Sequence, residues 1–564
     1  MGTPAPAALE GTLSRLGDAL RAVELRLEVP GLDEAQRMRR ELVDQIEDYL
    51  LPRLRQMDAP LLMVVGGSTG AGKSTLVNSL VGSEVSPPGV LRPTTRAPVL
   101  VCHPDDVRWF EDDRVLPALS RTTGGPAGPG GLQLVPVAAL PAGLALLDSP
   151  DIDSVVEANR ELARQLLAAA DAWLFVTTAA RYADAVPWEL LHAARDRGTA
   201  LSLVLDRVPD EAAGEVAEHL GAMVAERGLE GTQLLVVPET RLDAGGLLPA
   251  GALAPVRDWL DALAADAQAR SGLVSRTLTG ALDSLPKRAA GVLAVLADQE
   301  TTAAGLREDA ETAYDRALGE VDEAMRSGEL LRGEVLARWH DVVGTGDLMR
   351  ALESRLGRLR DRVRSIITGG PPAADELRAA VESSVDAVVY AAADRAAERA
   401  AEAWRGRPAG RALLEGAPRL DAASADLLER TRESVRHWQG EVFDLVSREA
   451  GGKRTTARFA SLGVNGAGLV VMLAVFAQTG GLTGAEVAVA GGTSAVGQKL
   501  LEALLGDQAV RALAARARED LLRRARVLLD AEAARYHDRL AAEAPAAEAV
   551  ERLQEAVHAV EAAR

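Results

Sequence analysis

One short stretch near the beginning of the chain restricts its fold more than any other part of the sequence. Residues 61–75 read Leu-Leu-Met-Val-Val-Gly-Gly-Ser-Thr-Gly-Ala-Gly-Lys-Ser-Thr, and from Gly67 to Ser74 they match GxxxxGK followed by Ser or Thr. An apolar run precedes this pattern, and a helical run, 76–80, follows it. This strand–loop–helix order is the context in which the pattern binds phosphate. The stretch therefore predicts an α/β nucleotide-binding domain with a phosphate-binding loop, the P-loop.

Each residue type in the P-loop suits the binding of a nucleotide phosphate. Glycines let backbone N–H groups close around phosphate oxygens, and the amino terminus of the following helix adds a partial positive charge. We expect Lys73 to place its ammonium group on the β- and γ-phosphates and Ser74 to ligate Mg²⁺. The predicted nucleotide contacts in the loop are Gly67, Ser68, Thr69, Gly70, Ala71, Gly72, Lys73, Ser74 and Thr75.

Two further segments are expected to complete the metal and γ-phosphate site. Asp148 ends the apolar run 144–147, where a carboxylate holds Mg²⁺ through a water in P-loop hydrolases; a helix cap is the alternative. Segment 92–97 lies between the loop helix and the next strand, where GTPases place a switch threonine, and Thr94 and Thr95 are both candidates; an ordinary polar turn is the alternative. The predicted catalytic residues are Lys73, Thr94, Thr95 and Asp148, and the predicted metal ligands are Ser74, Thr95 and Asp148.

Apolar periodicity divides the chain into helical and mixed parts. Residues 7–57 carry apolar side chains at three- and four-residue steps, with Pro30 and Gly31 separating two helices. From about 60 to 250, Val/Leu runs alternate with helical segments, which predicts a mostly parallel sheet with helices on both faces. After about residue 252, long helices are expected to pack as a bundle. The predicted strands are 61–65, 98–102, 144–147, 173–176, 201–205 and 234–237.

The predicted fold class is an α/β P-loop domain inserted between N-terminal helices and a long all-helical region. Aromatic residues make up only 3% of the chain, and cores of Ala, Leu and Val suit closely packed helices. The predicted segments are N-terminal helices at 1–57, the nucleotide domain at 58–250, a helical stalk at 251–450, an apolar hairpin at 451–500 and returning helices at 501–564.

The segment 459–498 stands apart because Glu486 is its only charged residue. As a helix, 459–478 would be about 30 Å long, enough to cross a bilayer core, but its glycines and amide side chains weaken insertion. We favour a hairpin that dips into one leaflet; a spanning pair and a hairpin packed against protein are the alternatives. Basic residues that would meet lipid headgroups precede it: Lys453, Arg454 and Arg458.

Composition excludes several other classes of function. The net charge of −19 argues against general nucleic-acid binding, which needs a basic surface. The single cysteine, Cys102, excludes an internal disulfide and a Cys-rich metal site, and its apolar surroundings in the sequence predict a buried thiol. The N-terminal residues lack the basic start and apolar core of a signal peptide, so we expect a cytoplasmic protein.

With these motifs in place, the sequence resembles the dynamin superfamily, especially bacterial dynamin-like proteins. The resemblance rests on the P-loop, Pro-Thr-Thr at 93–95, Asp-Ser-Pro at 148–150 and the flanking helices. It implies a GTPase that uses Mg²⁺ and GTP and releases GDP, with 7–57 joining C-terminal helices in a neck. It also implies a lipid-contacting tip at 459–498, homo-oligomers formed through G domains and helices, and a place at the cytoplasmic face of a membrane.

Three positions depart from the pattern of that superfamily. Its Asp-x-x-Gly motif reads Asp-Ser-Pro-Asp here, so Asp151 replaces the glycine whose N–H meets the γ-phosphate. Its guanine-reading Asn-Lys-x-Asp motif reads Asp-Arg-Val-Pro. Arg207 is expected to stack on the base, with Asp206 or Asp210 pairing with guanine from a shifted position. The P-loop interior is Thr69-Gly70, where dynamins typically carry Gln-Ser.

The leading functional hypothesis is a GTP-hydrolysing protein that binds or remodels membranes. The alternatives are a P-loop switch or scaffold that acts on a protein partner, with ATP use or weak hydrolysis. An ABC-transporter ATPase is disfavoured because the chain has no Leu-Ser-Gly-Gly-Gln signature, and because Ser149 stands where a glutamate should follow Asp148.

Overall fold

The structure, a computed structural model, divides the chain into two compact units. The first unit comprises 1–26, 30–297 and 545–564, and the second comprises 27–29 and 298–544. Segments 92–96 and 459–498, which hold the predicted switch threonines and apolar hairpin, lie outside the described residues. The described residues are 6–87, 97–112, 115–116, 119–125, 127–128, 130–152, 157–327, 371–415, 419–449 and 507–563.

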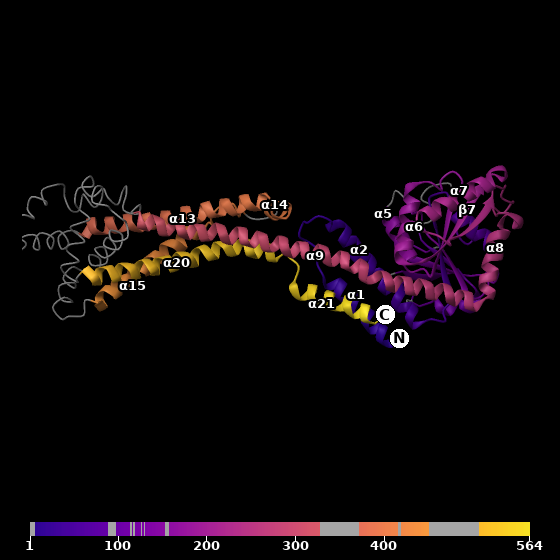
Figure 1. Cartoon of the computed structure of the whole chain (residues 1–564), viewed down its shortest axis with the longest axis horizontal. Coiled ribbons are helices and arrows are strands. Elements are labelled where there is room, and N and C mark those ends of the chain that lie inside the picture. Colours follow the sequence, from indigo (N-terminus) through magenta and orange to yellow (C-terminus); the bar gives the residue numbers. More distant parts are fainter. Residues whose placement is uncertain are drawn as a thin grey trace, which may run out of the picture. The chain divides into compact units, whose positions relative to one another are not determined.

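A twisted sheet forms the centre of the first unit (Figure 1). Its strands are β1 (Leu61–Gly67), β2 (Val99–Cys102), β3 (Ser120–Thr123), β4 (Gly131–Pro136), β5 (Leu144–Asp148), β6 (Ala172–Thr178), β7 (Ala200–Val208) and β8 (Gln233–Pro238). They lie in the order β3-β4-β2-β5-β1-β6-β7-β8. Every neighbouring pair is parallel except β2 and β5. The mostly parallel sheet is therefore confirmed.

All six predicted strands are present, and two further strands escaped prediction. The predicted strands are apolar runs, and β1, β5 and β6 are buried along their whole length, whereas β8 is only partly buried. In contrast, β3 is partly exposed at the sheet edge and consists of Ser-Arg-Thr-Thr. The strand β4 follows the glycine-rich loop that dominates this part of the sequence, so its buried Leu132 and Leu134 were not recognised as a strand.

Helices cover both faces of the sheet because side chains alternate between the faces along each strand. Leu62 and Val64 of β1 face one apolar cluster, whereas Met63 and Val65 face the other. The first cluster includes residues of α5 (Glu157–Ala168), α6 (Ala185–Arg197) and α7 (Ala213–Glu226). The second includes residues of α4 (Lys73–Val81), α8 (Ala250–Ala265) and the start of α9 (Ala267–Arg326). The predicted two-sided α/β architecture is confirmed.

Cys102 lies on the first of these faces. Its side chain is buried, as predicted, and burial raises the pKa of its thiol to about 12.

The N-terminal helices form a separate apolar cluster within the first unit. The helix α1 (Pro6–Ala22) lies beside α21 (Ala547–Ala562), as Figure 1 shows. The second N-terminal helix is α2 (Leu32–Asp44), which continues as a π-helical turn (Gln45–Leu50) and then as α3 (Leu51–Arg55). The cluster also takes in α9: its members include Leu13, Leu16, Leu42, Ile46, Leu285, Val292, Leu553 and Val557.

The prediction of helix throughout 7–57, apart from the Pro-Gly break, was wrong for residues 23–29. They form no helix, and their burial alternates from residue to residue. This two-residue period, in Val-Glu-Leu-Arg-Leu-Glu-Val, is typical of an extended segment with one buried side.

Buried polar contacts attach α3 and α9 to the amino-terminal ends of the strands, opposite the P-loop. The Arg53 guanidinium lies 3.1 Å from the fully buried Asp171 carboxylate, which also accepts a hydrogen bond from the Leu62 N–H. The Thr277 hydroxyl donates to the Asp171 carbonyl and accepts from the Ala200 N–H. These contacts fix both helices at the edge where β1, β6 and β7 begin.

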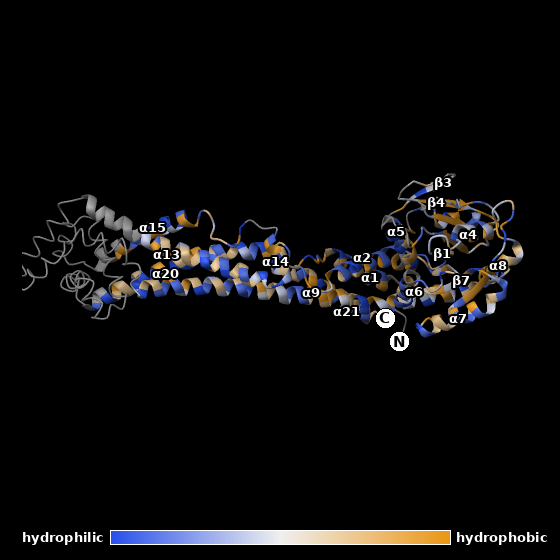
Figure 2. Ribbon diagram, turned by 90° about the horizontal axis from the view of Figure 1, so that it is seen from above, coloured by the Kyte–Doolittle hydropathy of each residue, from blue (hydrophilic) through white to orange (hydrophobic). Residues whose placement is uncertain are grey.

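The second unit is built from long helices that lie side by side (Figure 1). Besides the later part of α9, they are α13 (Pro371–Arg405), α14 (Pro408–Glu415), α15 (Leu427–Glu449) and α20 (Asp507–Ala541). Alanines make up much of their buried core, which also contains Trp404, Trp438 and Tyr536. Apolar and polar residues alternate in colour along these helices (Figure 2). Within the described residues, no helix is both long and apolar enough to span a bilayer.

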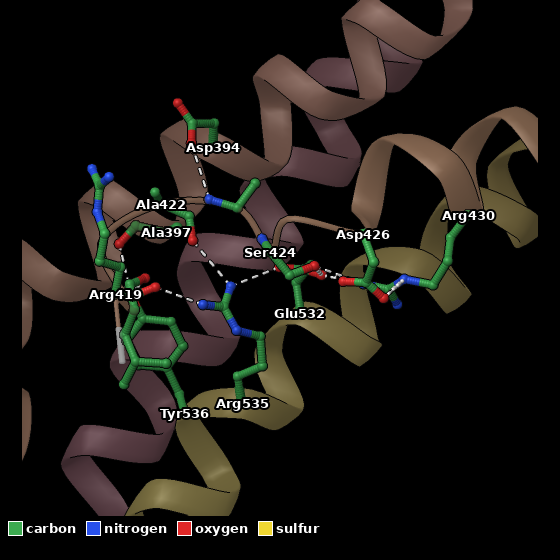
Figure 3. Close-up of polar contacts among 12 residues, drawn as sticks. Asp394, Ala397, Arg419, Ala422, Ser424, Asp426, Arg430, Glu532, Arg535 and Tyr536 are labelled. Carbon is green, nitrogen blue, oxygen red and sulfur yellow. Dashed lines mark hydrogen bonds and ion pairs between the residues drawn. The ribbon is translucent and has the colours of Figure 1, made fainter. Parts of the chain in front are cut away.

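One buried carboxylate organises the connection between α14 and α15 (Figure 3). Glu532 of α20 has no exposed surface, and its two oxygens accept hydrogen bonds from the Ser424 N–H and hydroxyl. Arg430 and Arg535 donate to the same carboxylate. Arg535 also donates to the Arg419 carbonyl at 2.7 Å, so the carboxylate and this arginine together hold the connection against α20.

Replacing Glu532 with alanine should lower the free energy of unfolding by about 1–3 kcal/mol, because Ser424 and two partly exposed arginines lose their buried acceptor. Glu519→Ala, at an exposed position of the same helix, should change it by no more than about 0.5 kcal/mol. Urea denaturation of both variants measures the difference. Equal midpoints for the two variants would show that the Glu532 cluster does not stabilise the unit.

Candidate nucleotide-binding site

The P-loop lies between β1 and α4 and needs glycine at two positions. Gly67 has a φ of 150°, and a Cβ there would lie 2.2 Å from the Val176 carbonyl oxygen. Gly72 has a φ of 100°, and a Cβ there would lie 2.5 Å from the Asp206 carboxylate. Left-handed backbone and close neighbours exclude other residues at both positions. The local sequence thus dictates a tightly curved loop.

The side chain of Lys73 is enclosed by the loop that precedes it. Its Nζ donates to the Gly67 carbonyl at 2.8 Å and to the Ser68 carbonyl at 3.2 Å. A third contact joins Nζ to Oδ1 of Asp151 at 2.5 Å, with Lys73 only 5% and Asp151 only 14% exposed. The ammonium group is therefore buried at the centre of the loop, beside an acidic side chain that the sequence did not place there.

Asp148 is positioned by strand pairing. β5 pairs in parallel with β1, and Asp148 lies opposite Val65, two residues before the P-loop glycine. One carboxylate oxygen accepts hydrogen bonds from the Ser74 and Ser86 hydroxyls, each at 2.6 Å. The other oxygen, Oδ1, is buried and has no hydrogen-bond partner among the described residues. Burial raises the pKa of the Asp148 carboxyl, and the two serine hydroxyls oppose that rise.

This arrangement fits Mg²⁺. The ion prefers hard oxygen ligands, and a hydroxyl and a carboxylate with an oxygen that lacks a hydrogen-bond partner meet at this point. Ser74 and Asp148 would hold the ion, as the sequence predicts. The contact of Ser86 with Asp148 was not predicted, because a serine beyond the loop helix carries no signal of its own.

Two residues near the end of β7 reach the same loop. Arg207, which has a φ of 54°, donates from Nη2 to the Gly70 carbonyl. Asp206 is buried beside Gly72, and burial raises the pKa of its carboxyl while Arg207 opposes that rise. Asp210, the alternative base-pairing residue, is exposed in the following turn. The structure thus brings Asp206 and Arg207 to the P-loop; their contact with a base stays a prediction.

Arg181 is a cation beside the P-loop that sequence reasoning missed. It lies in the turn after β6, and its Nη1 donates to the Thr69 carbonyl at 2.9 Å. Its Nε forms an ion pair with Asp184 at 2.8 Å. An arginine three residues after a strand that neighbours β1 was the available signal. Among the predicted residues, Thr94 and Thr95 lie outside the described part of the chain.

Comparison with known proteins gives a match in this domain. The sequence profile of the Dynamin family matches residues 63–117, which include the P-loop and α4. The predicted resemblance to the dynamin superfamily is confirmed. No curated protein sequence matches the chain.

Solved structures are also similar to this chain. Era from Aquifex aeolicus, bound to GDP and AlF4⁻, shares 18% identity over 36% of this chain, with a TM-score of 0.24. The chain spans 56% of the length of that Era structure. A bacterial dynamin pair, described as sensing and tethering membranes, shares 11% identity over 94% of this chain and 95% of its own, with a TM-score of 0.38.

Substituting Gly72 with alanine should weaken nucleotide binding roughly 10- to 100-fold, because the new Cβ displaces Asp206 and shifts the loop. Gly82→Ala is the matched control, since Gly82 also has a positive φ but has no atom near its absent Cβ. That control should lose about 1 kcal/mol of stability and keep its affinity. Isothermal titration with GTP or ATP measures both variants, and equal affinities would refute the tight-loop geometry.

Proposed function

We propose that the chain binds and hydrolyses GTP with Mg²⁺ as a dynamin-like protein. The observation that supports this most directly is the closed P-loop, in which Lys73 is buried against loop carbonyls and Ser74 bonds to Asp148. Lys73 at the centre of the loop suits binding of a phosphate chain, and the Ser74–Asp148 pair suits binding of its metal ion. Together they support the proposal of a site for phosphoryl transfer.

Catalysis in this class consists mainly of positioning and of neutralising phosphate charge. Loop N–H groups and Lys73 would hold the β- and γ-phosphates, and Mg²⁺ bound at Ser74 and Asp148 would supply positive charge to the same oxygens. The Arg181 guanidinium donates to the carbonyl of Thr69. Thr69 is the residue that stands where dynamins typically have glutamine. We infer that this guanidinium adds charge on the γ-phosphate side of the loop. A switch threonine, Thr94 or Thr95, completes the proposed set.

Guanine preference is the part of the proposal that rests on the Dynamin family match. The guanine-reading motif is absent, but Arg207 is held against the P-loop and Asp206 lies beside it. We propose that the arginine plane stacks on the base and that the buried carboxylate pairs with its edge.

Purified protein should bind GTP and GDP more tightly than ATP and ADP, each with Mg²⁺. Lys73→Ala should weaken triphosphate binding roughly 100-fold, because a charge-assisted contact to the phosphates is lost. Isothermal titration measures all four nucleotides. Equal or stronger adenine binding would replace the GTPase proposal with a P-loop ATPase.

Membrane contact is proposed from the sequence of 459–498 and its preceding basic residues. Together with pairing of G domains between copies, it would let hydrolysis act on a membrane.

The protein should float with vesicles containing anionic lipid, and Leu473→Asp, which places a charge in the apolar run, should reduce flotation by about tenfold. Val487→Asp tests the second arm. If neither the native protein nor any variant floats with the vesicles, the result favours a switch that acts on a protein partner.

A nucleotide-dependent switch with slow hydrolysis is the second candidate. The observation that favours it is the ion pair between Asp151 and Lys73, which places a negative charge where a phosphate oxygen would bind. Single-turnover hydrolysis separates it from the leading proposal, because a switch would hold GTP intact over the time in which a remodelling enzyme consumes it.

A further inference from the structure

The segment after β5 is fixed against the P-loop strand. The Ser149 N–H and the Ser149 hydroxyl both donate to the Val65 carbonyl, at 3.3 and 2.9 Å. Pro150 follows and restricts the backbone further. Asp151 is therefore delivered to Lys73 by a constrained backbone, and its position is a property of the fold.

The hydrogen-bonding capacity of the Lys73 ammonium is filled by its three contacts. A lysine ammonium carries three N–H donors. In Lys73 these meet the carbonyls of Gly67 and Ser68 and the carboxylate of Asp151. A phosphate oxygen can bind this ammonium only by displacing one of them. The two carbonyls belong to the loop itself, so the carboxylate is the contact that a phosphate must replace.

The position of Asp151 indicates which phosphate it opposes. In a P-loop the backbone N–H groups cradle the phosphate chain and the lysine reaches the β- and γ-phosphates, so the terminal γ-phosphate is the one exposed to groups that approach the lysine from outside the loop. Asp151 stands three residues after Asp148, outside the loop, and its carboxylate reaches Lys73 from that side. A carboxylate there would repel a γ-phosphate but leave room for a nucleotide that ends at the β-phosphate.

We propose that Asp151 is a specificity-determining residue that favours nucleoside diphosphate over triphosphate by occupying the γ-phosphate side of Lys73. The inference rests on the proposed nucleotide binding. Triphosphate binding then requires the Asp151 side chain to leave Lys73, so the γ-phosphate and this carboxylate compete for the same ammonium group. With diphosphate bound, the backbone N–H groups of the loop can hold the β-phosphate while Lys73 keeps Asp151 as its partner.

Asp151→Asn tests the proposal, because it removes the charge and keeps the size of the side chain. Diphosphate and a non-hydrolysable triphosphate are titrated, with Mg²⁺, into the native protein and the variant. The variant should bind triphosphate roughly tenfold more tightly or better, while its diphosphate affinity changes by less than about threefold. Asp58→Asn is the matched control: Asp58 is an exposed carboxylate just before β1, at the far end of that strand from the P-loop. It should alter neither affinity.

Thermal unfolding of the nucleotide-free proteins provides a second readout. Asp151→Asn should melt at a lower temperature than the native protein, because Lys73 loses its buried anionic partner, and triphosphate should restore more stability to the variant. If triphosphate raises the melting temperature of the variant no more than that of the native protein, the proposal is overturned, while the rise itself shows that nucleotide binds. Absence of binding to both proteins would refute the proposed function and this inference with it. Binding of triphosphate by the variant alone would support the inference.

Discussion

The parallel pairing of β5 with β1 is the constraint on which the candidate site depends. It sets Asp148 opposite Val65, so the carboxylate meets the Ser74 hydroxyl at the point where the P-loop turns into α4. The same register places Ser149 against the Val65 carbonyl and directs Asp151 to Lys73. A shift of one residue would move these side chains to the opposite face of the sheet and separate the serine from the carboxylate.

Much of the fold was predictable because its elements carry their own signals. The strand β1 is a continuous apolar run followed by a loop whose glycines have no substitute, and the long helices show their apolar stripes. The edge strand β3 has no such signal, since its Ser-Arg-Thr-Thr sequence is half-exposed and is a strand only because β4 lies beside it. Residues 23–29 were misread because they stand between two genuine helices.

The site divides in the same way. Lys73, Ser74 and Asp148 belong to local motifs and could be named from the sequence. Arg181 and Ser86 could not, because the groups that they contact lie more than 60 residues away in the chain. The residue at position 151 was recognised as a departure from the family pattern, but its pairing with the P-loop lysine depends on the packing of two strands.

The packing of α1 against α21 has a consequence for how the protein is made. The two helices are separated by more than 500 residues, yet the apolar side chains of α1 share a cluster with Leu553 and Val557. A ribosome needs roughly half a minute to two minutes to synthesise that length. Through that interval part of the α1 surface lacks its final cover, so the nascent chain offers a binding surface to chaperones until its last helix emerges.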